Sequence, residues 1–281
     1  TIYTRTKAGE SSFASGSASV VTSSKAGAAD APDVGNPTVT ASTVTLPQNS
    51  TWEYSTDGNG WSGTYHFEGL YAATKYTYHV RVKETEDAEA SKAATIVVYT
   101  AKDPPTEGVG YEVNYGPETL TVTPGYEVNT EKDFSGTTIF DGDAIQPGST
   151  YYVRAADSDG DDGLTIPHSE AVGFKLNNRP KAPGSLQGTN ETFADEKDGK
   201  ITGTSSAMEY KLSSDTDWTL CTGESVTGLA PGNYLVRYQA TDIAFASGSA
   251  PVEIKTGQQR TYTLNVPAPA VAPVTYGYTQ P

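Results

Sequence analysis

The chain has 281 residues, a net charge of −15 and a sequence pI near 4.5. This negative charge disfavours nucleic acid and anionic membrane surfaces as partners, and no run of 18 apolar residues is present that could insert into a membrane. The single cysteine, Cys221, excludes an intramolecular disulfide and a metal site built on several cysteines.

The N-terminal segment looks like the end of a domain. Residues 13–18 are Phe-Ala-Ser-Gly-Ser-Ala, and the same hexapeptide occurs at 245–250, after a strand pattern near the C-terminal end of the chain. Residues 2–5 are a weak copy of that strand pattern. We therefore expect residues 1–26 to be the C-terminal hairpin of a preceding repeat, with two paired strands within residues 2–21.

Two markers then recur in fixed register along the chain. A Tyr-x-Val-Arg strand ends at Arg81, Arg154 and Arg237, and an apolar-Glu-apolar strand is centred on Glu53, Glu127 and Glu209. The glutamate precedes its arginine by 28, 27 and 28 residues, which indicates an internal repeat. The sequence thus predicts complete repeats over 27–102, 103–179 and 180–258, joined by short, stiff proline-containing linkers. We call them the second, third and fourth repeats, because residues 1–26 are expected to belong to the first. Residues 259–281 are expected to be a linker and the start of a following module.

Each repeat has the pattern of a small all-β domain. The 18 tyrosines, 28 glycines and 17 prolines favour strands separated by frequent turns. In residues 76–82, alternation places Tyr78 and Val80 inside, and His79 and Arg81 outside. Six or seven short strands per repeat predict a fold class of tandem small antiparallel β-sandwiches in an elongated array.

The end of each repeat carries a family resemblance. The stretch from Leu229 through Pro231-Gly232 to Tyr234-x-Val236-Arg237, followed by a loop, a serine and an alternating strand, resembles the end of a fibronectin type III domain. Residues 198–247 are similar to immunoglobulin-like repeats in large surface proteins of gut Firmicutes, and residues 274–281 resemble the start of a module found after such repeats. The resemblance implies an extracellular or bacterial cell-wall location. Some proteins of this group bind host immunoglobulins, and others carry carbohydrate-active modules.

Residue types that recur in every repeat are expected to be scaffold. Trp52, Trp61 and Trp218 are interpreted as core or core-rim residues, because inward aromatic rings are what a thin sandwich needs. The recurring glutamate and arginine are expected to form cross-strand ion pairs, if their strands are neighbours.

One acidic loop occurs in a single repeat. Asp157, Asp159 and Asp161 have an oxygen-rich spacing that suits calcium, the one candidate metal cofactor. The alternative is a solvated acidic hairpin loop. The loop departs from an EF-hand because Asp162 stands where the turn glycine belongs and His168 where the bidentate glutamate belongs. Residues 103–179 carry 14 acidic and 4 basic side chains, a net charge of −10, which could attract a basic partner or keep a rod soluble.

No catalytic motif is found, and we expect no enzymatic activity. The first functional hypothesis is a segment that binds a host protein, such as immunoglobulin, with loop residues Phe13 and Phe245 as anchors if they are exposed. The alternative is a spacer or carbohydrate-binding segment of a large extracellular glycoside-active enzyme.

Overall fold

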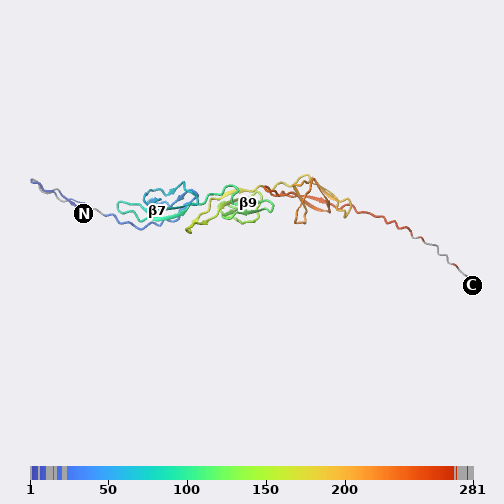
Figure 1. Cartoon of the computed structure of the whole chain (residues 1–281), viewed down its shortest axis with the longest axis horizontal. Helices are drawn as coiled ribbons and strands as arrows, with labels where there is room; N and C mark the ends of the chain where they lie inside the picture. The colour runs from blue at the N-terminus through green and yellow to red at the C-terminus, as the bar shows by residue number, and fades with distance from the viewer. Residues whose placement is uncertain are drawn as a thin grey trace. The chain divides into compact units, whose positions relative to one another are not determined.

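The computed structural model describes residues 2–5, 7–10, 15, 18–20, 24–268, 270 and 277, which form strands and loops without a helix. Among these residues there is accordingly no helix of the length and hydropathy needed to cross a membrane. The chain divides into two compact units, Thr1–Leu176 and Asn177–Pro281, whose elements can be followed by colour in Figure 1. The all-β fold class is confirmed.

The N-terminal strands form a two-stranded antiparallel sheet. β1 (Ile2–Thr4) pairs with β2 (Ala18–Val20), and Tyr3 lies opposite Ser19. The predicted pairing within residues 2–21 is confirmed for the described residues. Their origin in a preceding repeat stays a prediction.

The second repeat contains two three-stranded antiparallel sheets. One has the order β3 (Thr38–Val39), β4 (Val44–Thr45), β6 (His66–Phe67), and the other β5 (Trp52–Ser55), β7 (Lys75–Val82), β8 (Ala94–Tyr99). Tyr78 and Val80 are buried in a core that includes side chains from both sheets, as alternation along β7 predicts. His79 lies on the opposite face of β7, as alternation predicts, and is partly exposed, with Nδ1 3.3 Å from the Thr95 hydroxyl oxygen.

The third repeat contains a two-stranded sheet, a four-stranded sheet and a hairpin. The sheets are β9 (Tyr111–Asn114) with β10 (Thr119–Val122), and β12 (Thr138–Ile139), β11 (Tyr126–Asn129), β13 (Thr150–Ala155), β16 (Val172–Lys175) in that order. The hairpin of β14 (Ser158–Asp159) and β15 (Thr165–Ile166) contains the acidic loop.

The fourth repeat is a complete seven-stranded sandwich. Its sheets have the orders β17 (Gln187–Thr189), β18 (Gly199–Thr202), β21 (Ser225–Leu229), and β20 (Thr219–Leu220), β19 (Met208–Leu212), β22 (Gly232–Tyr238), β23 (Ala250–Ile254). Ile201 of the first sheet and Val236 of the second meet in one core with Cys221, whose thiol pKa is raised by burial. Three strands packed on four make the fourth repeat a fibronectin type III-like sandwich, and the second and third repeats have the same arrangement with fewer strands.

Each marker arginine lies between a carboxylate and an aromatic ring. In the three repeats the arginine nitrogen lies 2.6, 2.9 and 2.7 Å from the carboxylate oxygen of the residue opposite it on the neighbouring strand. The guanidinium carbon is 4.0, 3.9 and 4.0 Å from the ring centroid. The sets are Glu53–Arg81–Trp61, Glu127–Arg154–Phe134 and Glu209–Arg237–Trp218. The predicted ion pairs are confirmed. Trp52 packs against the core as expected, whereas the rings of Trp61 and Trp218 do not face inward as expected and lie over the marker arginines instead.

A basic residue before each repeat contacts that repeat. Lys25, Lys102 and Arg179 are spaced 77 residues apart (102 − 25 and 179 − 102). The first pairs with the Glu84 carboxylate. The second donates from Nζ to the Ala156 carbonyl at 2.5 Å, and the third from Nη1 to the Ala246 carbonyl at 2.9 Å. Each contact lies in the loop that follows the Tyr-x-Val-Arg strand, so the linker is held against the repeat that it enters.

Candidate binding site

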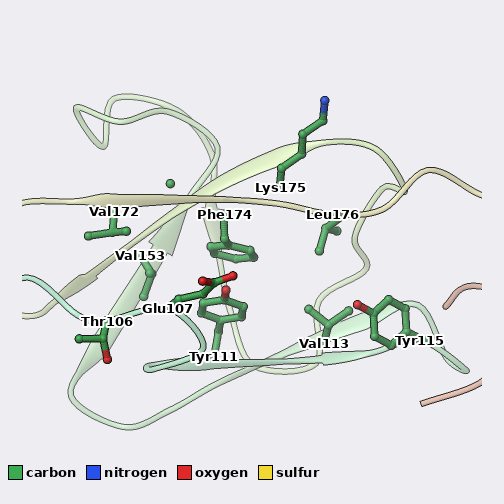
Figure 2. A pocket seen from close by; sticks show the side chains of 11 residues that line it. Thr106, Glu107, Tyr111, Val113, Tyr115, Val153, Val172, Phe174, Lys175 and Leu176 are labelled. Carbon is green, nitrogen blue, oxygen red and sulfur yellow. The ribbon is translucent and has the colours of Figure 1, made fainter. Parts of the chain in front are cut away.

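A cleft opens between the two sheets of the third repeat, at the edge where β9 and β16 lie. Its volume is about 640 Å³. Figure 2 shows the side chains that line it, with β9 on one side and β16 on the other. The lining residues are Thr106, Glu107, Tyr111, Val113, Tyr115, Val153, Val172, Gly173, Phe174, Lys175 and Leu176.

Two stacked rings join the sheets within the cleft. The rings of Tyr111 and Phe174 have centroids 3.7 Å apart and an interplanar angle of 11°, and they face each other in Figure 2. Burial, with a smaller effect of the nearby Glu107 carboxylate, raises the pKa of the Tyr111 phenol, although a backbone hydrogen bond at Gly108 opposes the rise. Tyr111 is therefore neutral at physiological pH and retains its hydroxyl as a hydrogen-bonding group.

The cleft exists because two edge strands are not paired with each other. β16 is the last strand of its sheet, β9 pairs with β10, and no strand pairing joins β9 to β16 in the part of the chain that the structure describes. Only residues 115–118 separate β9 from β10, so this connection is too short to cover the edge of β16.

In the fourth repeat, the connection between the first two strands contacts the chain just after β23. This connection spans residues 190–198. The Glu191 N–H donates to the Lys255 carbonyl at 3.2 Å, the Lys255 N–H donates to Asn190 Oδ1 at 2.9 Å, and Phe193 forms a parallel bridge with Gln258. The longer connection thus packs beside residues 255–258, whereas the third repeat has only residues 115–118 between its first two strands.

The charge around the cleft is negative. The third repeat has a net charge of −10 over residues 103–179. Glu107 lines the cleft, whereas the exposed Glu112 lies on the opposite face of β9 from the lining residues Tyr111 and Val113. Lys175 is the one basic residue of the described lining, and Figure 2 shows its side chain directed away from the ring pair. The cleft therefore attracts cationic groups more than anionic ones.

The predicted calcium ligands are not brought together. The Asp157 carboxylate accepts a hydrogen bond from the His168 N–H at 2.5 Å and lies 3.0 Å from His168 Nδ1. Burial acts to raise the pKa of Asp157, but the hydrogen bonds from His168 outweigh it and the pKa is lowered. Asp159 and Asp161 are exposed, and the described residues contain no group of three or more His, Cys, Asp or Glu side chains placed to hold a metal ion. These three aspartates do not fit a calcium site in this conformation.

The acidic hairpin instead contacts the second repeat. The Asp162 carboxylate lies 2.5 Å from Lys75 Nζ on β7, and this hydrogen bond lowers the pKa of Asp162 and raises that of Lys75. Gly160 lies so close to Tyr99 that a Cβ at Gly160 would lie 2.8–3.0 Å from the end of that ring. The single-copy loop therefore forms a contact between neighbouring repeats.

The proposed aromatic anchors are not supported. Phe245 is only 1 % exposed, so its expected role as an exposed contact is wrong. Its loop folds inward because the neighbouring Ser247 accepts a hydrogen bond from the Tyr238 N–H at 2.8 Å and is itself buried. Phe13 lies outside the described residues.

Comparison with known proteins gives solved structures but no family. No family model matches the chain, and no curated protein matches it. The chain is similar to the FN1–FN3 domains of chicken CNTN1, with 15 % identity, a TM-score of 0.24, and coverage of 82 % of this chain and 99 % of that one. It is also similar to the central fibronectin-III array of RIM-binding protein, with 14 % identity, a TM-score of 0.20, and coverage of 81 % and 98 %. Because both TM-scores are low, the fold assignment rests on the strand order within each repeat.

Proposed function

We propose that the chain is a non-catalytic binding segment whose contact surface is the cleft between β9 and β16. The observation that carries this proposal is that the most acidic repeat has a cleft of about 640 Å³ between its two sheets, beside the edge of β16 that is unpaired among the described residues. Open edges of β-sandwiches are sites where partner proteins bind.

The partner in this proposal is a host protein, with immunoglobulin as the first candidate, and the chain belongs to a secreted or wall-attached bacterial protein. The support for partner and location is the resemblance of the repeats to bacterial surface proteins. The negative charge of the third repeat adds that the contacted surface of the partner should be basic.

The test is a binding measurement on the full chain. The chain is immobilised and exposed to purified human immunoglobulins and to whole human serum, at low and at physiological salt. Binding at micromolar concentration that weakens as salt rises is the expected result, because exposed charges are screened. If neither immunoglobulin nor any serum protein is retained, the host-protein proposal fails.

A matched pair of variants locates the contact. Glu107→Lys reverses a charge in the cleft lining, and Glu131→Lys makes the same change at an exposed residue outside it. Loss of binding in the first variant alone supports the cleft. Equal binding by both variants would place the contact elsewhere on the chain.

A spacer is the second candidate, and one observation favours it. Each linker is held to the following repeat by a basic residue, and ordered linkers suit a spacer. A spacer would bind none of the serum proteins. The carbohydrate-binding alternative gains no support, because the three tryptophans of the chain contact marker arginines or the core.

A further inference from the structure

We propose that the second repeat binds a small neutral aromatic compound with a hydroxyl group, in a cavity lined by Tyr78. This site is separate from the cleft of the third repeat and goes beyond the function proposed above. The path of β5, the aromatic lining, the Tyr78 hydroxyl and the paired charges of the exposed lining residues support it.

The cavity lies between β6 and the first half of β7, at the point where β5 has ended. Its volume is about 550 Å³, and its lining includes Thr56, which follows β5, and Phe67 of β6. β5 pairs with β7 only as far as Ser55 opposite His79, so no β5 residue lies opposite residues 75–78. In the fourth repeat the corresponding strand, β19, continues further past its marker glutamate. The early end of β5 therefore leaves space beside β7.

Aromatic rings form much of the apolar lining. The ring centroids of Phe67 and Tyr78 are 4.4 Å apart, and those of Tyr76 and Tyr78 are 6.4 Å apart with an interplanar angle of 27°. Leu70 also lines the cavity and is only partly buried. Aromatic rings attract further rings in offset or tilted arrangements, so this lining favours a ligand that contains a ring.

The Tyr78 side chain carries a hydrogen-bonding group that the chain itself does not use. Tyr78 is 1 % exposed, and its hydroxyl has no hydrogen-bond partner among the described residues. The equivalent hydroxyls of Tyr151 and Tyr234 bond to the backbone of their own repeats. Buried polar groups are rarely left without a partner, so a ligand that bonds to the Tyr78 hydroxyl supplies what the chain lacks. The ligand reaches this covered hydroxyl when the partly exposed Leu70 side chain rotates aside.

The charged residues of the lining already have partners. Lys75 Nζ lies 2.5 Å from the Asp162 carboxylate, and the Glu68 carboxylate lies 3.0 Å from His66 Nε2. Neither charge is left for an ionic ligand, and burying an unpaired ion is costly. A ligand hydroxyl can both donate and accept a hydrogen bond, so it can pair with the Tyr78 hydroxyl in either role. The inferred ligand is therefore neutral and phenol-like.

The probes are para-cresol and toluene, which differ by one hydroxyl group. Each is titrated into the isotope-labelled full chain and followed by NMR. Para-cresol at millimolar concentration should shift the resonances of Phe67, Leu70 and Tyr76. Toluene should bind at the same residues several-fold more weakly, because it leaves the Tyr78 hydroxyl without a partner.

A matched pair of variants tests the hydroxyl itself. Tyr78→Phe keeps the ring and should lower the affinity for para-cresol to that for toluene, while the affinity for toluene stays unchanged. Tyr234→Phe removes the equivalent hydroxyl of the fourth repeat and should leave both affinities at the wild-type values. The inference is overturned if neither probe shifts the lining residues, if the wild-type chain binds both probes equally, or if Tyr78→Phe retains the preference for para-cresol.

Discussion

Replacing Tyr78 by phenylalanine should leave the second repeat as stable as before or make it more stable. The Tyr78 side chain is 1 % exposed, and its hydroxyl oxygen is buried without a hydrogen-bond partner. Tyr78 lacks a partner because Tyr76, two residues earlier, makes the tyrosine-corner contact in this repeat. The Tyr76 hydroxyl accepts a hydrogen bond from the upstream Tyr71 N–H at 2.9 Å. Burial raises the pKa of Tyr78 to about 12.

At the equivalent tyrosines of the other repeats, Tyr151 and Tyr234, replacement by phenylalanine should lower the stability of the repeat. The Gln146 N–H donates to the Tyr151 hydroxyl at 2.9 Å, and the Tyr234 hydroxyl donates to the Ala230 carbonyl at 2.9 Å. Losing a satisfied hydrogen bond costs about 0.5–1.5 kcal/mol, whereas removing an unsatisfied buried hydroxyl relieves about 1–3 kcal/mol of desolvation. Tyr78→Phe should therefore be more favourable than Tyr151→Phe or Tyr234→Phe by about 1.5–4.5 kcal/mol.

The assay is hydrogen exchange of the full chain, because it reports the stability of each repeat separately. For a domain of this size, a loss of about 1 kcal/mol in the free energy of unfolding corresponds to a fall in Tm of about 4–8 °C. Tyr78→Ala is the control for the ring, which lies 4.4 Å from the Phe67 ring between centroids, and its loss should cost about 3–5 kcal/mol. An ultraviolet titration of Tyr78→Phe should also lack the tyrosine that ionises near pH 12.

A destabilised Tyr78→Phe would refute the reasoning. If this substitution costs about as much as Tyr234→Phe, the Tyr78 hydroxyl has a partner in solution, such as a buried water. The three positions would then be energetically equivalent, and the tyrosine corner formed by Tyr76 would not explain any difference between them.

Three further outcomes are expected. Trp218→Ala should destabilise the fourth repeat by about 0.5–1 kcal/mol, because the Arg237 guanidinium loses the ring that it covers. Denaturant unfolding is the measurement, and an unchanged stability of this repeat would contradict the prediction. Gly160→Val should displace Tyr99, because the new Cβ would lie within 3.0 Å of its ring, and NMR shifts at Tyr99 are the measurement. The Asp57 carboxyl should titrate near pH 2, because backbone N–H groups of Gly60 and Asn59 and the Ser55 hydroxyl bond its charged form. Its contribution to stability should accordingly be complete above the ordinary pKa of 3.8 and be lost as pH falls through about 2.

The framework of each repeat could be predicted from the sequence. The constant distance from Glu209 to Arg237, together with alternation along strands, places the two side chains opposite each other, and they pair at 2.7 Å. The stacking of Trp218 on Arg237 was not predicted, because it depends on the path of the loop that carries the ring.

The candidate site was harder to predict. The sequence does contain a cue to the cleft, because the connection after β9 spans residues 115–118 and that after β17 spans 190–198. Whether a short connection leaves a gap depends on the separation of the sheets, which alternation does not define. The spacing of Asp157, Asp159 and Asp161 suggested one metal site, but Lys75, the partner of the adjacent Asp162, lies in another repeat. Phe245 appeared to be a loop residue because glycine and serine surround it, yet Ser247 turns that loop inward.

The linker contacts also define where one module of this chain could be exchanged for another. Lys102 precedes the third repeat but bonds to it, and Arg179 stands at the predicted end of that repeat but bonds to the fourth. A graft of residues 103–179 would therefore lack Lys102, which bonds to the third repeat, and would include Arg179, which bonds to the fourth. A graft that begins at Lys102 and ends at Asn178 would keep the 77-residue period and transfer the third repeat with its own anchor.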